Sequence, residues 1–478
     1  MNAVGYSTER ATPKCRSFRV AGPGTVRAME TARASRGRIQ IVLVPGFAGF
    51  DALGQLHYYA DVTPVFRQWA AEWAARGGAH PVLHYFDNLP TAGVATRGAR
   101  LRDWIAKRIA RGELQEGDRL ALVGHSTGGL DVRQLVWNLA RHPGEEIPVD
   151  GSRGAACTVQ AREVLELMQR IVFLSVPQWG TNIADWVRAH AAARMALIAD
   201  LRGAIAARDV PLAGQLERWA AGNAAAFTRS ELFLAVKDAL AEMDVPPGAD
   251  PTAVAAALEA RSEVELWLRC VWADFAAIDD LAVAPGPDGA TPARFDADTR
   301  RRELDAWTAH GILSRSYATV GSRAFQFERG VPAPAWKLLN PFTWAEPDGG
   351  AAGAPRTDLV YRMSYRACAG GPFGIPGGGA TAAATRFDTG QVQELEVWDN
   401  DGIVNTASML WPEGSATRLV PGDHGDIIGH FRLVEAAGAG PRVHHTYDLL
   451  GSGSGFGEET FRSVWRDVFD FCAGGATA

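Results

Sequence analysis

The chain has 478 residues, of which 47% are apolar and 21% are charged, values close to the average for a soluble globular protein. Such a chain can bury a large core, which excludes wholesale disorder. Its 48 basic and 54 acidic residues give a formal net charge of −6, so we expect no nucleic-acid partner and no basic surface for an anionic membrane.

The sequence carries no clear membrane segment or export signal. No run of about 18 apolar residues occurs, so no transmembrane helix is predicted. Residues 1–36 lack the apolar stretch of a signal peptide, which indicates a cytoplasmic location, with secretion by another route as the alternative. The five cysteines lie far apart, without a CxxC pair or a metal-ligand spacing, as is typical of a reducing compartment.

The first part of the chain alternates between apolar strand patterns and amphipathic helix patterns. This alternation is typical of a mostly parallel sheet whose strands are joined by crossover helices, the α/β class. The predicted strands are at 38–44, 81–85, 120–123 and 170–176. The predicted helices between them are at 65–76, 98–110 and 130–140.

After the strand at 170–176 the pattern becomes almost continuously helical, from Asn182 to about Leu281. A capping box is expected at Thr228–Glu231, and Asp250 is expected to cap a helix whose first residue is Pro251. The predicted division of the chain is an N-terminal extension at 1–36, a first core segment at 37–180, a helical lid or cap at 181–300 and a second core segment at 301–478.

Weaker strand patterns resume in the last third of the chain. They cover Ser316–Val320, a segment around Leu395–Trp398 and Arg418–Val420, and an amphipathic helix is predicted at Glu458–Phe471. The Gly- and Pro-rich segment Gly370–Gly379 has neither a strand before it nor a helix after it, so we interpret it as a loop and not as a phosphate-binding site.

The strongest functional signal is a GxSxG sequence around Ser126, placed between a predicted strand and a predicted helix. The glycines two positions away, Gly124 and Gly128, permit the sharp turn that exposes a nucleophilic serine at the carboxyl end of a sheet. The backbone N–H of Thr127 then lies at a helix N-terminus, where it can stabilise an oxyanion. The alternative is an ordinary helix-start turn, with the serine chosen for its local hydrogen bonds.

A second oxyanion donor is expected in the loop that follows the first strand, Val44–Phe50. Gly46 lets the backbone approach a substrate closely, and Phe47 would offer its backbone N–H. A simple Pro-Gly turn is the alternative.

A serine nucleophile needs a histidine base and a carboxylate that orients it, here both after Ser126 in the chain. Asp401, at a tight turn after a strand, is the predicted acid, and His424, in a loop between glycines, is the predicted base. Asp399 and His430 are the rival acid and base. His125 is interpreted as a packing neighbour of the nucleophile.

The sequences VPGFAGFD, GHSTGG, SVPQWGT, NDGIVNTASM and GDHGD lie in this order between residues 39 and 430. This combination resembles the bacterial lipases of the α/β-hydrolase superfamily, especially those of thermophilic Bacillus relatives. The resemblance implies an α/β-hydrolase fold with a helical lid over an acyl-binding cleft. It also implies the same site residues, namely Ser126 as nucleophile, Asp401 as acid, His424 as base, and Phe47 and Thr127 as oxyanion donors.

The chain departs from these lipases at several positions. Pro45 replaces a usual histidine, and the segment Pro177–Thr181 alters the expected pocket wall. Lipases of this group commonly hold a structural calcium near the histidine loop; Asp426 matches one ligand position, but Phe431 occupies the next acidic one. No counterpart of the zinc ligands is found, and the chemistry requires no cofactor.

We therefore expect a lipase or carboxylesterase that acts on an ester or lipid. The alternatives with the same residues are a polyester (polyhydroxyalkanoate-type) depolymerase, a thioester or amide hydrolase and an acyltransferase. A non-catalytic binding protein with a hydrolase fold is the alternative of a different class. The aromatic residues of the predicted lid either line an acyl site or form its core: Trp186, Trp219, Phe227, Phe233 and Trp267.

Overall fold

The computed structural model describes residues 37–49, 52–53, 56–150, 156–181, 184, 187–188, 195–196, 198–200, 202–203, 211–223, 231–241, 243–244, 248–282, 297–321, 382–395, 399–412, 416–431, 448–450 and 454–474. No helix in this described part of the chain is long and apolar enough to cross a membrane.

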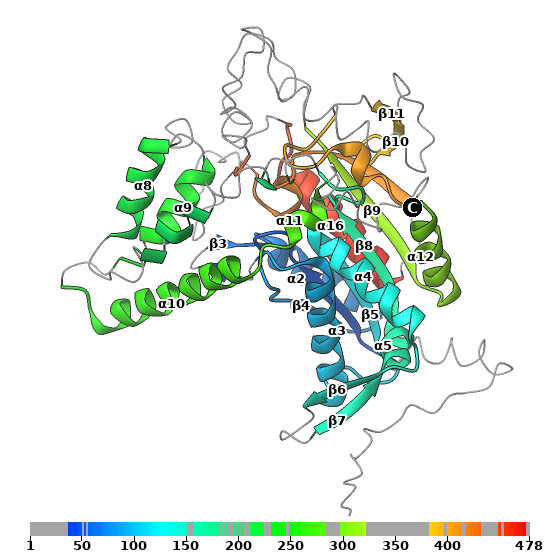
Figure 1. Ribbon diagram of the computed structural model, residues 1–478. Helices are drawn as coiled ribbons and strands as arrows, with labels where there is room; N and C mark the ends of the chain where they lie inside the picture. Colours follow the sequence, from blue (N-terminus) through cyan, green and yellow to red (C-terminus); the bar gives the residue numbers. More distant parts are fainter. Residues whose placement is uncertain are drawn as a thin grey trace, which may run out of the picture.

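A central eight-stranded sheet runs through the described part of the chain in the order β11-β10-β12-β9-β8-β5-β1-β4 (Figure 1). Every neighbouring pair is parallel except β10 and β11 at one edge. The strands are β1 (Ile39–Val44), β4 (Pro81–Tyr85), β5 (Arg119–His125), β8 (Met168–Leu174), β9 (Leu313–Val320), β10 (Ala382–Arg386), β11 (Val392–Leu395) and β12 (Thr417–Pro421).

Helices cover both faces of this sheet, which explains why its central strands are apolar at successive positions. On β1, Ile41 and Leu43 pack toward one face, whereas Val42 and Val44 pack toward the other. The first face is covered by α2 (Val62–Ala75) and α16 (Glu458–Ala473), and the second by α3 (Val94–Ala110), α4 (Thr127–Arg141) and α5 (Ala161–Leu167). The predicted α/β-hydrolase fold is confirmed by this mostly parallel sheet with helices on both faces.

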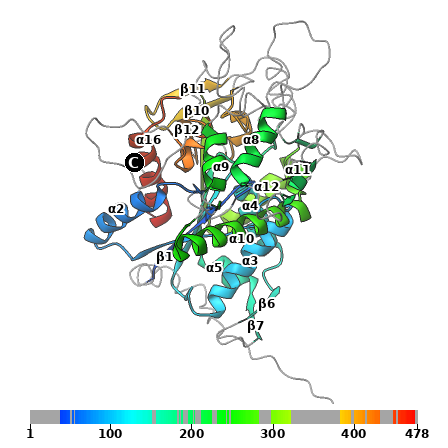
Figure 2. The same cartoon turned by 90° about the vertical axis from the view of Figure 1, so that its left-hand side faces the viewer.

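Further helices occupy the chain between β8 and β9. They are α8 (Leu212–Asn223), α9 (Glu231–Ala241), α10 (Pro251–Ala273), α11 (Ala277–Leu281) and α12 (Ala297–Ala309). Figures 1 and 2 show α8, α9 and α10 grouped beside the sheet, at its left in Figure 1. These three share an apolar cluster of their own, which includes Leu216, Leu240 and Leu268. α12 instead contacts α4 and runs across the border predicted at residue 300.

The N-terminal end of α10 has the predicted cap. The side chain of Asp250 accepts hydrogen bonds from the backbone N–H groups of Thr252 and Ala253, and Pro251 is the first helical residue. α9 begins at Glu231, but Thr228 lies outside the described residues.

The strand predicted around Leu395–Trp398 meets β11, which spans Val392–Leu395, at Leu395; residues 396–398 lie outside the described part. β10 was not predicted. The antiparallel hairpin of β6 (Glu146–Asp150) and β7 (Ala156–Gln160) was also not predicted, and neither was the short pair β2 (Ala52–Leu53) and β3 (Leu56–His57). The Gly-rich segment at 370–379 lies outside the described residues.

Candidate active site

Ser126 lies at the turn between β5 and α4, at the carboxyl end of the sheet. Its φ of 53° and ψ of −132° are a strained conformation for a residue with a side chain. The flanking glycines are needed for close packing: a Cβ on Gly124 would lie 2.6 Å from the backbone of Gly129, and one on Gly128 would lie 2.4 Å from the carbonyl oxygen of Val44. The sequence-predicted nucleophile therefore sits on the expected sharp turn.

The loop after β1 approaches this serine closely. A Cβ on Gly46 would lie 2.6 Å from Cβ of Ser126, so only glycine fits there without movement. The backbone N–H of Gly46 donates to the hydroxyl of Tyr58 at 2.8 Å, and its carbonyl accepts from the guanidinium of Arg97 at 3.1 Å. Because C=O and N–H point in opposite directions across a trans peptide, the N–H of Phe47 is directed away from Arg97.

Arg97, on α3, holds this loop from the inside of the protein. Its fully buried guanidinium pairs with Asp131 of α4 at 2.8 Å and also donates to the carbonyl oxygens of Pro45, Gly46 and Leu89. Burial raises the pKa of Asp131 to about 6, although the nearby Arg97 opposes the shift. Arg97 was not predicted as part of the site. Its position four residues before Leu101, on the buried face of α3, was the available signal.

The predicted acid and base are in direct contact. Nδ1 of His424 lies 2.7 Å from Oδ2 of Asp401, whose side chain is fully buried. Oδ1 of Asp401 accepts from the backbone N–H groups of Ile403 at 3.0 Å and Val404 at 2.7 Å, and Oδ2 also accepts from the hydroxyl of Thr319 at 2.7 Å. The carboxylate accepts all of these hydrogen bonds. Because an ionised carboxylate cannot donate, the hydrogen in the contact with His424 belongs to Nδ1 of the imidazole.

Backbone contacts hold the acid loop and connect it to the base loop. Asp401 lies in a turn closed by its own N–H, which donates to the carbonyl of Val404 at 3.1 Å. His424 follows β12, and its backbone N–H donates to the carbonyl of Asp401 at 3.0 Å. The acid and the base are therefore tied together through both side chain and backbone.

The rival residues have other contacts. Nε2 of His430 lies 3.2 Å from the carbonyl oxygen of Tyr58, and burial lowers the pKa of His430 to about 4. Asp399 is buried, and its carbonyl oxygen accepts from the N–H of Thr406 at 2.8 Å. The side chains of the predicted acid and base, Asp401 and His424, meet at hydrogen-bond distance, whereas His430 faces the backbone of Tyr58.

His125 directly precedes Ser126 and contacts the base loop. Its ring centroid lies 4.6 Å from that of His424, and its Nε2 lies 3.1 Å from the carbonyl oxygen of His424. Its Nδ1 lies 2.6 Å from the hydroxyl of Tyr58. Burial, followed by the charge of His424, lowers the pKa of His125 well below its usual value. The nucleophile turn and the base loop therefore lie side by side.

The helices between β8 and β9 contact the loop after β1. The indole N–H of Trp267, on α10, donates to the carbonyl of Ala48 at 3.3 Å. Phe275, between α10 and α11, packs edge to face on Phe47 with 5.4 Å between the ring centroids. Of the other aromatic residues predicted for the lid, Trp186 and Phe227 lie outside the described residues, and the side chains of Trp219 and Phe233 are not described.

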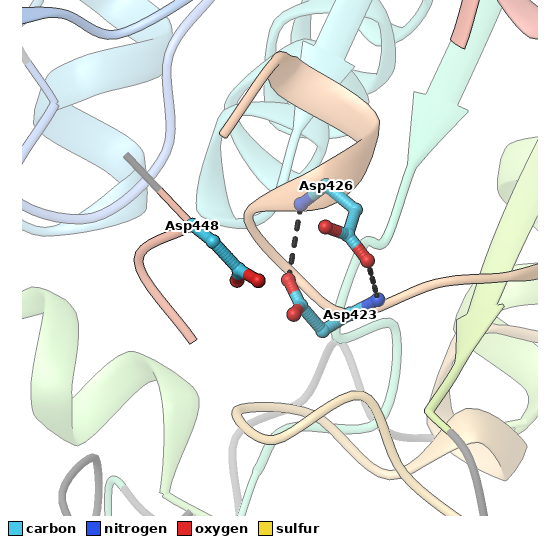
Figure 3. A group of neighbouring side chains, drawn as sticks. All are labelled: Asp423, Asp426 and Asp448. Carbon is cyan, nitrogen blue, oxygen red and sulfur yellow. Dashed lines mark hydrogen bonds between the residues drawn. The ribbon is translucent and has the colours of Figure 1, made fainter. Parts of the chain in front are cut away.

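Three carboxylates gather beside the base loop, those of Asp423, Asp426 and Asp448 (Figure 3). Each offers an oxygen, and these oxygens lie within 4.8 Å of one another. The backbone N–H of Asp423 donates to Asp426 at 2.7 Å, and the N–H of Asp426 donates to Asp423 at 3.0 Å. Burial, and then the neighbouring Asp423, raise the pKa of Asp426 well above its usual value.

This set of oxygen donors fits a hard cation such as Ca²⁺. It includes the predicted Asp426, whereas Asp423 and Asp448 were not predicted as ligands. Phe431, at the position where the resemblance leads one to expect an acid, packs against the rings of Phe456 and Phe461 instead. Asp448 comes from a segment further along the chain, so spacing within the histidine loop could not have revealed it.

Comparison with known proteins gives only distant similarities. No protein-family model and no curated protein sequence matches the chain. Lipase 1 from Pelosinus fermentans is 17% identical over 83% of this chain and 94% of its own, with a TM-score of 0.36. A metagenomic carboxyl esterase is 14% identical over 92% of this chain and 76% of its own, with a TM-score of 0.33. EstA from Clostridium botulinum is 14% identical over 88% and 89%, with a TM-score of 0.32.

Such distant similarities do not decide the reaction of this chain. The contacts of His424 with Asp401 and with His125, the residue before Ser126, carry the functional evidence.

Proposed function

We propose that this chain hydrolyses carboxylic esters, as a lipase or carboxylesterase, through an acyl-enzyme formed on Ser126. The observation that carries this proposal is the 2.7 Å contact between Nδ1 of His424 and Oδ2 of Asp401, in a loop that also contacts the residue preceding Ser126. A neutral imidazole that donates through Nδ1 keeps its lone pair on Nε2, which is the proton acceptor that a serine nucleophile needs.

In the proposed reaction, Oγ of Ser126 attacks the acyl carbon and its proton moves to Nε2 of His424. The tetrahedral intermediate collapses when His424 returns this proton to the leaving alkoxide, which departs as an alcohol. A water molecule then attacks the acyl-enzyme while His424 takes its proton, and Ser126 is regenerated as the acid leaves. Asp401 orients the imidazole and stabilises its positive charge in both halves of the cycle.

The backbone N–H groups of Phe47 and Thr127 are the proposed oxyanion donors. Thr127 is the first residue of α4, where N–H groups have no acceptor within the helix. Phe47 follows Gly46, whose carbonyl is turned toward Arg97. Donors that are oriented before the substrate arrives stabilise the developing charge without reorganisation, and each typically contributes ~3–4 kcal/mol to the transition state.

The proposed substrate is an ester with an apolar acyl or alcohol group. The rings of Phe47 and Phe275 pack together beside the oxyanion loop, and Trp267 of α10 contacts Ala48 of the same loop. Apolar rings around a few well-placed polar groups are typical of sites that bind apolar ligands. This argument supports an apolar ester and leaves the length of the acyl chain to experiment.

For the base loop we propose a structural calcium held by Asp423, Asp426 and Asp448. The three carboxylates lie close enough to repel one another when ionised, and a divalent cation would offset that repulsion. A bound cation would also connect the loop of His424 to the segment of Asp448. No step of the reaction is assigned to it.

A fluorophosphonate probe tests the proposal, because it reacts covalently with an activated serine. We expect labelling of the wild type but not of Ser126→Ala, together with hydrolysis of p-nitrophenyl esters by the wild type alone. Absence of labelling in a folded wild type would favour a non-catalytic binding protein. Labelling with ester turnover that rises as an alcohol acceptor is added would favour an acyltransferase.

A further inference from the structure

Two side chains outside the proposed triad, Tyr58 and His125, form a continuous hydrogen-bond chain between the oxyanion loop and the base loop. The backbone N–H of Gly46 lies 2.8 Å from Oη of Tyr58, and this oxygen lies 2.6 Å from Nδ1 of His125. Nε2 of His125 lies 3.1 Å from the carbonyl oxygen of His424. The chain therefore begins at the residue before Phe47 and ends on the backbone of the proposed base.

The chemistry of these groups leaves one arrangement of protons. A carbonyl oxygen only accepts, so Nε2 of His125 carries the hydrogen that faces His424. Nδ1 of a neutral ring is then an acceptor, and the hydroxyl of Tyr58 donates to it. The same hydroxyl oxygen accepts the N–H of Gly46. Each link thus depends on the direction of the next, as in a cooperative network.

Burial keeps both side chains neutral. Desolvation lowers the pKa of His125 well below its usual value and raises the pKa of Tyr58. A charged His125 would carry a hydrogen on Nδ1 as well, which would reverse the direction of the hydrogen bond with the hydroxyl of Tyr58.

Tyr58 also contacts the base loop through its backbone. Its carbonyl oxygen lies 3.2 Å from Nε2 of His430, six residues after His424. Gly46 is held on two sides, by Tyr58 at its N–H and by Arg97 at its carbonyl oxygen. The peptide that presents the N–H of Phe47 is therefore oriented by side chains of the protein without any contribution from substrate.

We propose that Tyr58 and His125 are positioning residues that hold the oxyanion loop and the base loop in the correct relative placement for catalysis. This inference rests on the proposed function of Ser126 and His424. The two side chains act through the N–H of Phe47 and the ring of His424. Because these two groups interact most strongly with the transition state, losing their alignment lowers kcat and leaves KM nearly unchanged.

Tyr58→Phe removes the central hydroxyl and keeps the ring. We expect kcat for a p-nitrophenyl ester to fall roughly 10- to 100-fold, the range that a small misplacement of catalytic groups produces. Tyr317→Phe is the control, because Tyr317 is also fully buried and its hydroxyl donates to the side chain of Asp467 on α16 at 2.5 Å, outside both loops. The control should keep the wild-type kcat even where it lowers thermal stability.

Substitutions of His125 separate the two ends of the chain. Gln places an amide near the former Nε2 and can still donate to the carbonyl of His424, whereas Asn places its amide near the former Nδ1 and reaches only Tyr58. We expect kcat in the order wild type, His125→Gln, His125→Asn, with KM within a factor of about two in all three. Equal kcat values for wild type and both variants would overturn the inference.

Nitrogen-15 NMR of labelled histidines gives a readout that does not depend on activity. The signals of His125, assigned by their loss in His125→Gln, should show a protonated Nε2 and an unprotonated Nδ1. In Tyr58→Phe the Nδ1 signal should move toward that of a nitrogen without a hydrogen bond. A hydrogen on Nδ1 in the wild type would contradict the proposed direction of the chain.

The phosphonate probe keeps this inference distinguishable from the proposed function. A folded wild type that is neither labelled nor active overturns both. A wild type that is labelled and active, combined with Tyr58→Phe and Tyr317→Phe variants of equal kcat, overturns the positioning role alone. A labelled wild type with a slow Tyr58→Phe, a normal Tyr317→Phe and equal KM values supports it.

Discussion

The hydroxyl of Thr319 lies 2.7 Å from Oδ2 of Asp401, the same oxygen that faces the imidazole of His424. The hydroxyl of Ser175 lies 2.7 Å from that of Thr319 and, because Thr319 donates to the carboxylate, Ser175 donates to Thr319. Both hydroxyls are buried at the carboxyl ends of β8 and β9. The proposed acid is thus supported by a chain of hydroxyl groups that comes from the sheet itself.

Thr319→Val keeps the shape of the side chain and removes the hydroxyl. We expect kcat to fall about 10-fold, since a hydrogen bond to a charged group contributes about 1.5–3 kcal/mol, while Thr319→Ser keeps most of the activity. Steady-state kinetics with a short p-nitrophenyl ester measure the difference. A Val variant as fast as the Ser variant would show that the backbone N–H groups of Ile403 and Val404 orient Asp401 on their own.

Asp401→Asn should lower turnover by several orders of magnitude, on the order of 10⁴-fold, while the fold stays intact. An amide facing Nδ1 of His424 favours the wrong tautomer, in which Nε2 no longer accepts a proton. Single-turnover kinetics measure the loss, and circular dichroism checks the fold. Asp399→Asn is the control and should be mild; a mild Asp401→Asn with a severe Asp399→Asn would reassign the acid.

His424→Ala should remove nearly all esterase activity, because the proposed base is lost. His430→Gln should keep most of it, since Gln can retain a donor toward the carbonyl of Tyr58 where Nε2 of His430 now lies. Initial rates at saturating ester compare the two variants. The opposite pattern would make His430 the base.

Sequence patterns predicted those strands and turns that are determined by residues adjacent in the chain. β4 has the predicted bounds, Pro81–Tyr85, and the GxSxG turn follows from glycines that the strained backbone of Ser126 requires. Patterns of this kind did not predict β10 or the β6–β7 hairpin. In β6, for example, Glu146 and Pro148 are exposed and few residues are apolar, so the sequence of β6 alone does not indicate a strand. Its pairing with β7 makes it one.

In the candidate site, too, some residues could be predicted from local sequence motifs and others could not. Ser126, Asp401 and His424 carry sequence motifs, and the contact between the acid and the base joins loops only 23 residues apart. Tyr58, Arg97 and Thr319 carry none. Arg97 reaches the carbonyl of Pro45 across 52 residues, and Thr319 reaches Asp401 across 82, so only the packing of helices and strands brings these supporting groups to the site.

Acidification should destabilise the protein partly through His430. Its folded-state pKa of about 4 lies below the ordinary 6.5, so between these values the unfolded chain binds more protons and stability falls as pH falls. This group alone should lower the free energy of unfolding by about 2 kcal/mol from pH 8 to pH 5. Urea unfolding of wild type and His430→Gln at both pH values isolates that share. An equal loss in both proteins would contradict it.

Calcium should raise the thermal stability of the wild type relative to the same protein in chelator. A ligand at about 100 times its Kd adds ~2.7 kcal/mol to the free energy of unfolding. Asp448→Asn should respond much less. In chelator it should be at least as stable as the wild type, because burial, and then the charges of Asp423 and Asp448, raise the pKa of Asp426, and removing one carboxylate relieves part of that repulsion. Asp103→Asn, which removes an exposed carboxylate paired with Arg102, is the control and should keep the full calcium response. Calorimetric scans with calcium and with chelator compare the three proteins, and a full response in Asp448→Asn would remove this residue from the proposed ligand set.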